Sequence, residues 1–315
     1  MFGSLTYVLA MLSLSIVAIA SPIQLARRAI STELLERFTL FSQFATLSAC
    51  DQNINHTGQR LTCDYGTCGL VEADNTTVIN TFHSDHGPTG YIALDHTREL
   101  ILITFRGTVS KSDGNTDLDL GLTPIGEVCT GCKAHHGFWA YWTAIASQAT
   151  AQLHDATSAY PGYRLTVVGH SLGGGLRRWQ GLSFERKGSV WTLSQLTFKN
   201  QWTFGAPKPG NKKLAEFITN QQLPNSIYRA THTTDPVPKV PINLPFLDWS
   251  QPSPEYWVTQ ETGVQATADR VHYVEGINSR AGNAGSDRDL RWPNPEHGWY
   301  FGNMSVCAAP IDASS

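Results

Sequence analysis

The chain has 315 residues, a formal net charge of −3 at pH 7 and a sequence pI near 6.4. This length allows one large α/β unit with a substantial core. No basic stripe dominates any region, so we expect no nucleic-acid partner. A small neutral or acidic molecule remains open as a ligand.

The first twenty residues have the pattern of an export signal. An apolar run at 9–20 is too short to span a bilayer comfortably, and Ala18 and Ala20 provide the small residues of an A-x-A cleavage site. We therefore expect 1–20 to be a signal peptide and the protein to be secreted. The stretch 21–28 ends in the dibasic pair Arg27-Arg28, which fits a short pro-segment or a surface charge pair equally well.

Six cysteines in an exported chain are candidates for disulfides. Two pairs are close in sequence, and the third would join the two ends of the fold: Cys63 with Cys68, Cys129 with Cys132, and Cys50 with Cys307. The third bond would stabilise the fold by about 4 to 5 kcal/mol in the chain-entropy model. The C-x-x-C pair also fits a redox or zinc site, but the sequence has no second such pair to complete one. Three N-x-[ST] sequons also fit secretion, at Asn55, Asn75 and Asn303.

Apolar periodicity locates the remaining elements. A polar, cysteine-containing stretch at 51–72 indicates a surface excursion, and 95–98 indicates a turn. Three- and four-residue spacing predicts helices at 31–50, 140–154 and 214–221, and apolar or β-branched runs predict strands at 78–82, 90–95, 99–105, 165–168, 202–204 and 227–231. Strands that alternate with helices favour an α/β fold with a mostly parallel central sheet and helices on both faces.

The predicted strand at 165–168 is followed by GHSLG at 169–173, a G-x-S-x-G pattern. In that context it predicts a nucleophile elbow, with Ser171 exposed on a sharp turn. A serine hydroxyl needs a base to take its proton and a carboxylate to orient that base. Asp235 and His297 follow Ser171 in the order Ser, Asp, His, with His170, His232 and His272 as rivals for the base. Metal binding by His135-His136 is less favoured than packing, and we expect no cofactor.

Five motifs occur together and carry a specific resemblance: FRGT (105–108), GHSLGG (169–174), FGAP (204–207), TTDPVP (233–238) and HGWYF (297–301). The chain resembles secreted fungal class 3 lipases, a family that also holds feruloyl esterases, from about residue 41 to 306. The resemblance implies one α/β-hydrolase domain at 29–315, the three disulfides proposed above, Ser171 as nucleophile, Asp235 as orienting carboxylate and His297 as general base. We therefore expect a monomer that hydrolyses a lipid or another small ester and that can contact a lipid–water interface.

An oxyanion hole is implied as well. The tetrahedral intermediate needs donors about 3 Å from its negative oxygen. The Leu172 N–H, at the start of the predicted helix, is one candidate. Thr108, through its N–H and hydroxyl, resembles the family's second donor, although Thr108 also fits an ordinary turn residue.

Two stretches depart from the family pattern. Residues 175–201 carry Arg177 and Arg178 where the family has a small apolar run, so a catalytically impaired homologue and a reading-frame or splice error are both alternatives. Sequencing the transcript across 174–202 tests the second. The other stretch, 110–116, occupies the position of the family's lid but lacks a large apolar residue. We therefore expect little adsorption to lipid, and we rank lipase-type hydrolysis ahead of feruloyl ester hydrolysis on the cysteine pattern.

Overall fold

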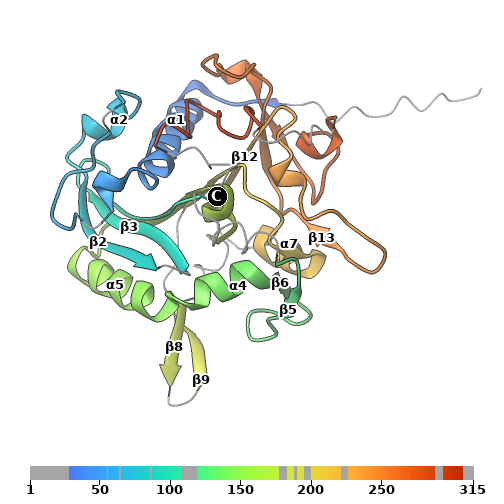
Figure 1. Cartoon of the computed structure of the whole chain (residues 1–315), viewed down its shortest axis with the longest axis horizontal. Coiled ribbons are helices and arrows are strands. Elements are labelled where there is room, and N and C mark those ends of the chain that lie inside the picture. Colours follow the sequence, from blue (N-terminus) through green and yellow to red (C-terminus); the bar gives the residue numbers. More distant parts are fainter. Residues whose placement is uncertain are drawn as a thin grey trace, which may run out of the picture.

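The computed structural model describes residues 28–54, 56–63, 65–84, 87–107, 119–176, 183–187, 190–194, 200–220, 226–287 and 294–307 (Figure 1). The helices are α1 (Thr32–Leu47), α2 (Gly69–Glu72), α4 (His136–Thr143), α5 (Ala146–Ala159), α6 (Ser171–Leu176) and α7 (Lys212–Thr219), with 3-10 turns η1 (Asp51–Asn53), η3 (Val237–Lys239), η4 (Ala268–Arg270) and η5 (Asn283–Gly285).

The main sheet has nine strands in the order β1-β15-β14-β12-β10-β7-β4-β3-β2. They are β1 (Arg28–Ala29), β2 (Thr77–Ser84), β3 (Gly87–Asp95), β4 (Leu100–Phe105), β7 (Arg164–His170), β10 (Asn200–Phe204), β12 (Ile227–His232), β14 (Glu255–Val258) and β15 (Val271–Val274). The five central strands, from β14 to β4, are parallel, and both edges are antiparallel. The predicted α/β fold is therefore confirmed, with a mixed sheet whose parallel part lies at the centre.

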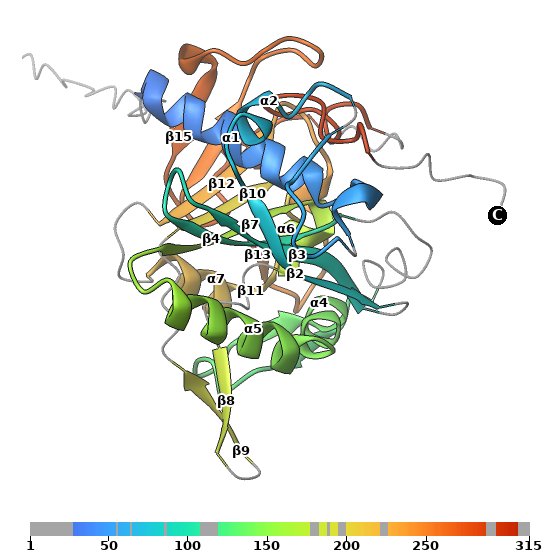
Figure 2. The same cartoon turned by 90° about the vertical axis from the view of Figure 1, so that its left-hand side faces the viewer.

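Helices cover both faces of this sheet. Figure 2 shows α1 on one face, with α4, α5 and α7 on the other. The α1 face is held by aromatic rings: Trp202 of β10 stacks on Phe41 and Tyr228, with ring centroids 4.3 and 3.8 Å apart. Each such buried ring contributes roughly 2 to 3 kcal/mol through removal of apolar area from water. Among the described helices, none is long and apolar enough to cross a membrane.

One predicted helix is divided into two, and some strands were not predicted. The helix predicted at 140–154 is two helices, α4 and α5, because Ile145 N donates to Trp142 O and tightens the chain between them. β14 and β15 were not predicted, and His272, one of the rival histidines, lies in β15. The segment 175–201, which departs from the family pattern, contains a hairpin of β8 (Ser183–Lys187) and β9 (Val190–Ser194) that extends away from the main sheet (Figures 1 and 2).

A separate four-stranded sheet joins β5 (Leu122–Pro124), β6 (Lys133–His135), β11 (Gly210–Asn211) and β13 (Trp249–Ser250).

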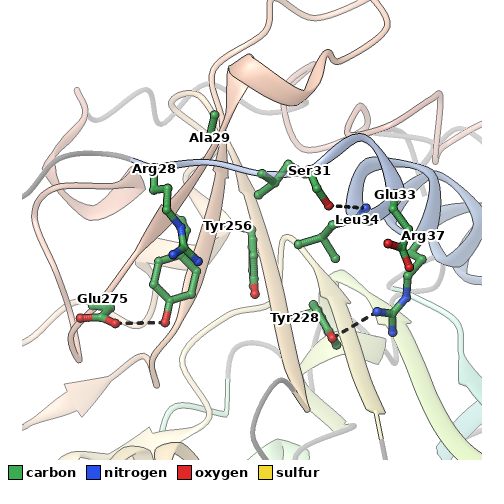
Figure 3. Close-up of a pocket in the computed structure, with 11 residues that line it drawn as sticks. Arg28, Ala29, Ser31, Glu33, Leu34, Arg37, Tyr228, Tyr256 and Glu275 are labelled. Carbon is green, nitrogen blue, oxygen red and sulfur yellow. Dashed lines mark hydrogen bonds between the residues drawn. The ribbon is translucent and has the colours of Figure 1, made fainter.

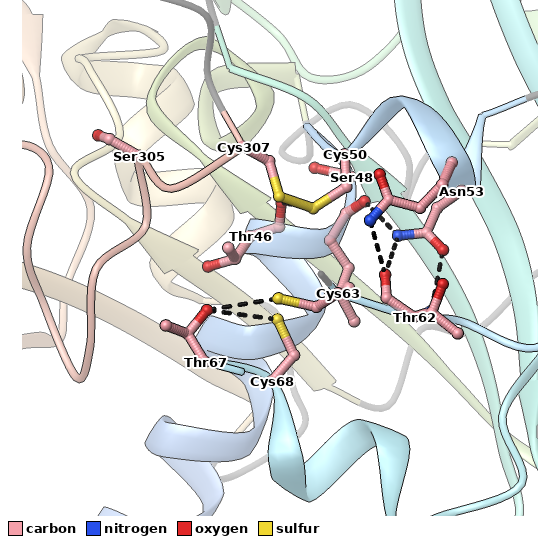
Figure 4. The surroundings of a disulfide bond; sticks show 12 residues. Thr46, Ser48, Cys50, Asn53, Thr62, Cys63, Thr67, Cys68, Ser305 and Cys307 are labelled. Atoms are coloured by element: carbon pink, nitrogen blue, oxygen red, sulfur yellow. Dashed lines mark hydrogen bonds between the residues drawn. A yellow bond between two sulfur atoms is a disulfide. The ribbon is translucent and has the colours of Figure 1, made fainter. Parts of the chain in front are cut away.

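The structure contains two of the three expected disulfides, Cys50–Cys307 and Cys129–Cys132. The expected bond between Cys63 and Cys68 is not formed in the structure, where both residues are buried thiols. Figure 4 shows the Thr67 hydroxyl beside both sulfurs, at 3.4 Å from Cys63 and 3.7 Å from Cys68. These contacts satisfy the two thiols without a covalent bond.

Candidate active site

A sharp turn places Ser171 at the carboxyl edge of the parallel strands. β7 ends at His170, and Ser171 opens α6 with φ 53°, a left-handed value that is strained for any residue but glycine. A Cβ on Gly169 would lie 2.3 Å from Gly173 O, and one on Gly173 would lie 2.2 Å from Phe105 O. Only glycine lets these backbones approach so closely, which explains both glycines of the G-x-S-x-G pattern.

The structure brings Ser171, His297 and Asp235 together. Ser171 Oγ lies 2.8 Å from His297 Nε2, and His297 Nδ1 lies 2.9 Å from Asp235 Oδ2. Asp235 follows β12, whereas His297 lies in the turn at 295–298, so the three residues come from three separate segments. Both His297 and Asp235 are buried. This chain of hydrogen bonds is the arrangement that activates a serine hydroxyl.

The environment of Asp235 keeps its carboxyl group ionised. Burial alone would raise its pKa, but the adjacent His297 and hydrogen bonds from His297, Tyr300 and Val237 N lower the pKa below its ordinary value. Tyr300 is also buried, and burial next to Asp235 raises the pKa of its hydroxyl well above the ordinary value. Tyr300 therefore stays protonated and donates to the carboxylate. The sequence analysis missed this residue, although it lies within the HGWYF motif.

The three rival histidines have other partners. His170 Nε2 donates to the carbonyl oxygen of His297 at 2.9 Å, and His232 Nδ1 lies 3.0 Å from the carbonyl oxygen of Glu296. Burial, followed by the neighbouring His297, lowers the pKa of His170 to about 3, so its ring is neutral at pH 7. His170 and His232 thus hold the backbone that carries His297. His272 Nε2 lies 3.2 Å from the hydroxyl of Thr259.

A buried network of polar side chains contacts the backbone of Asp235. Asn283 Nδ2 donates to the backbone oxygen of Asp235 at 3.0 Å, and Asn283 N donates to Glu255 Oε1 at 3.0 Å. Glu255 also forms a buried ion pair with Arg229 at 3.3 Å and accepts a hydrogen bond from Thr231. Removing one partner of the ion pair would leave an uncompensated buried charge. Through Asn283, the network links η5 to the backbone of Asp235. Sequence spacing gave no signal for Asn283.

The predicted oxyanion residues are only partly described. Thr108 lies outside the described residues, as do 110–116. Leu172 is described and is buried directly after Ser171. Gly107 lies next to the serine, since a Cβ there would be 3.2 Å from the Ser171 Cβ. The end of β4 is therefore beside Ser171.

The adjacent histidines of the sequence have separate environments. His135 is buried and stacks on Phe138 with ring centroids 3.8 Å apart. His136 is exposed, and its Nδ1 lies 2.5 Å from Asp119 Oδ2. Within the described ranges, no group of three or more His, Cys, Asp or Glu side chains is arranged to hold a metal ion.

A cavity of about 610 Å³ lies near the amino-terminal ends of the parallel strands (Figure 3). It is lined by Arg28, Ala29, Ile30, Ser31, Glu33, Leu34, Arg37, Tyr228, Tyr256, Tyr273 and Glu275. Arg37 donates to the Tyr228 hydroxyl at 3.4 Å, and Arg28 lies over the Tyr273 ring. The cavity contains no residue of the Ser171 site, because Ser171 and Asp235 follow the opposite ends of their strands.

Comparison with known proteins agrees with this geometry. The protein family described as Lipase (class 3) matches residues 102–244. The chain is 32% identical over 310 residues to the secreted mono- and diacylglycerol lipase A of Penicillium cyclopium, covering 97% of each chain. It is 29% identical to the secreted mono- and diacylglycerol lipase 1 of Fusarium solani, covering 96% of this chain and 89% of that one. The crystal structure of the Aspergillus oryzae mono- and diacylglycerol lipase superposes with a TM-score of 0.74 at 31% identity, covering 88% of this chain and 100% of that one.

Proposed function

This chain belongs to the class 3 lipase family, and we propose that it is a secreted serine ester hydrolase that cleaves acylglycerols or short-chain acyl esters through an acyl-enzyme. The hydrogen-bond chain from Ser171 through His297 to Asp235, at 2.8 and 2.9 Å, is the observation that carries the proposal. The names of the relatives support acylglycerols as the substrate class.

The proposed reaction begins at the Ser171 hydroxyl. His297 Nε2 takes the hydroxyl proton while Oγ forms a bond to the ester carbonyl carbon. The tetrahedral intermediate collapses, and the alcohol leaves with the proton from His297. Water then gives a proton to His297 and attacks the acyl-enzyme, so the carboxylic acid departs and Ser171 regains its proton. Throughout, Asp235 accepts from Nδ1–H and stabilises the positive charge that His297 carries in each intermediate.

We assign the oxyanion hole to the backbone N–H of Leu172 and to Thr108. The position of Leu172 directly after the nucleophile and the closeness of Gly107 to Ser171 support this assignment. Donors fixed at the place where the negative oxygen forms stabilise the transition state more than the ground state, and loss of one typically lowers the rate about 100-fold or more.

The amino-terminal processing is also a proposal. We assign 1–20 to a signal peptide, 21–28 to a pro-segment and 29–315 to one catalytic domain that acts as a monomer. The secreted relatives support export. Cleavage after Arg28 would divide β1, in which Arg28 pairs with Tyr273. Amino-terminal sequencing of the secreted protein locates the cut.

The central test is hydrolysis of a soluble nitrophenyl butyrate by the purified protein and by Ser171→Ala. We expect the variant to lose about 10⁴-fold or more in rate. Equal rates would contradict the role of Ser171. An inactive, folded wild type would favour the alternative of an impaired homologue with an altered 175–201 segment, although the triad distances argue against a displaced site.

Feruloyl ester hydrolysis is the alternative activity. The cysteine pattern that favoured the lipase group is weaker evidence now that Cys63 and Cys68 are thiols. The ranking therefore rests on the relatives, which are acylglycerol lipases by name. Rates with tributyrin and with methyl ferulate decide between them, and efficient ferulate release with negligible tributyrin cleavage would reverse the ranking.

A further inference from the structure

The loop between η3 and β13 exposes three apolar side chains. Ile242, Leu244 and Phe246 are 52%, 56% and 104% exposed. Asn243, between the first two, is also exposed and donates from Nδ2 to Trp249 O at 3.1 Å. We call these three residues the apolar loop.

The tip of the apolar loop is a tight turn. Leu247 N donates to Leu244 O at 3.0 Å, with Pro245 and Phe246 between them. Phe246, the third residue of this turn, has φ 74°. Type II turns require a positive φ at the third residue, a position that normally selects glycine. A phenylalanine at this position is held in an unfavourable backbone conformation with its ring in water. Strain of this kind, together with full exposure, points to a function for the ring.

The base of the loop is attached to the catalytic edge of the sheet. Lys208 N donates to Val240 O at 2.8 Å, and Lys208 Nζ donates to Pro241 O at 3.0 Å. Gln251 Nε2 donates to both Ala206 O and Pro238 O at 2.9 Å. Ala206 follows Gly205, which lies against the His297 ring. The loop is thus tied to the same segments that surround the triad.

We propose that the apolar loop docks the protein on an uncharged acylglycerol surface. Three side chains are far too few for a stable protein–protein interface, which buries roughly 800 Å² per partner, whereas apolar side chains can insert singly into an oil surface. Two of the nearby ammonium groups donate to oxygen acceptors: Lys208 to Pro241 O, and Lys239 to Ser286 Oγ at 3.0 Å and Asp287 O at 2.6 Å. The chain also has a net charge of −3. Charge therefore favours a neutral droplet over an anionic bilayer.

This proposal rests on the proposed function and changes one expectation drawn from the sequence. Weak adsorption was expected from the apolar content of 110–116 alone. The apolar loop provides a separate contact, at a different place in the chain, that holds the catalytic edge at the surface from which ester molecules are drawn.

Adsorption is measured in the Ser171→Ala protein, so that the lipid is not consumed. The fraction that floats with triolein droplets is compared with that of the same protein carrying Phe246→Gly. Glycine favours the φ of 74°, so this variant removes the ring and relieves the turn. We expect its ratio of bound to free protein to fall at least about tenfold. Ile242→Ser should lower the ratio as well. Leu70→Ser, a change of a 41% exposed residue on α2, is the matched control and should bind like the parent.

Three results would overturn the docking proposal. These are a parent protein that does not float, a Phe246→Gly protein that floats as well as the parent, or a stronger binding of the parent to phosphatidylserine vesicles than to triolein. Hydrolysis of the soluble ester by the chain with Ser171 tests the proposed function separately. Activity without flotation would reject only the docking, whereas flotation without activity would reject only the esterase function.

Discussion

The Tyr300 hydroxyl donates a hydrogen bond of 2.5 Å to Asp235 Oδ2, the same oxygen that lies 2.9 Å from His297 Nδ1. Tyr300 and His297 are three residues apart, so one short segment provides both the proposed base and a second donor to its carboxylate. The two bonds fix the carboxylate plane relative to the imidazole. Tyr300 is therefore a positioning residue, which acts on Ser171 only through Asp235 and His297.

Tyr300→Phe should weaken both stability and activity. A hydrogen bond to a charged group contributes about 1.5 to 3 kcal/mol, so we expect a loss of that order in the free energy of unfolding and a fall of about tenfold in kcat/KM. The folded pKa of Asp235 is depressed, so its stabilisation is complete above the unfolded pKa and is lost as pH falls through the folded pKa. Removing a donor raises that folded pKa, and the acid-unfolding midpoint should move to higher pH.

Tyr273→Phe is the control for this change. The Tyr273 hydroxyl donates to Glu275 at 3.2 Å near the surface, away from the triad. An equal shift of the acid-unfolding midpoint in both variants would show that loss of any tyrosine hydroxyl has this effect, and would contradict a specific role for Tyr300.

Gly173→Ala should displace Ser171, the proposed nucleophile. The new methyl group would lie 2.2 Å from Phe105 O, a backbone atom that cannot move without shifting β4. A shift of about 1 Å between reacting groups lowers rates about 100-fold, so kcat/KM for a soluble ester should fall by at least that factor. Gly126→Ala, where a Cβ meets no atom within 4 Å, should retain activity. Full activity of Gly173→Ala would mean that the elbow tolerates a side chain.

Loss of the Cys50–Cys307 disulfide should destabilise the fold strongly. The bond joins residues separated by 257 positions, and in the chain-entropy model closure of so long a loop contributes about 5 kcal/mol. We expect the Cys50→Ala/Cys307→Ala protein to unfold at much lower urea concentration. The Cys129–Cys132 bond spans only three positions, so its removal should cost less. Equal losses would indicate that the effect is packing rather than loop closure.

The sequence pointed to Ser171 as the nucleophile because its signal is local: a buried strand, two glycines and a serine within one turn. The choice of His297 over His170 and His232 came from the family motif, since a base is selected by tertiary distance and spacing along the chain does not encode it. The structure shows why the rivals are nearby, as both hold the backbone around His297. Contacts between distant segments, such as Asn283 with Asp235, were missed for the same reason.

Four of the five central strands, β4, β7, β10 and β12, were predicted from their apolar or β-branched runs, which are typical of parallel strands buried on both faces. The fifth, β14, was not predicted. The thiols of Cys63 and Cys68 were not predicted either, because close spacing in sequence permits a disulfide without requiring one. The apolar loop was also missed. Its apolar residues have the composition of a core segment, and only their exposure in the structure shows that they face solvent.

His170 should make the protein sensitive to mild acid. Its folded pKa of about 3 lies well below the unfolded value of about 6.5, because burial and His297 oppose its charge. As pH falls below 6.5 the unfolded chain binds a proton that the folded protein does not, so stability decreases from there down to about pH 3. The side chain is partly accessible, so we discount the full linkage and expect a loss of about 1 to 2 kcal/mol between pH 6.5 and 4.5.

His170→Gln retains an N–H that can donate to His297 O and has no titrating group. Thermal unfolding at the two pH values should therefore show a smaller fall in Tm for His170→Gln than for the wild type. The measurement is made on both proteins in the same buffers, and an identical fall in Tm would show that another group causes the acid sensitivity.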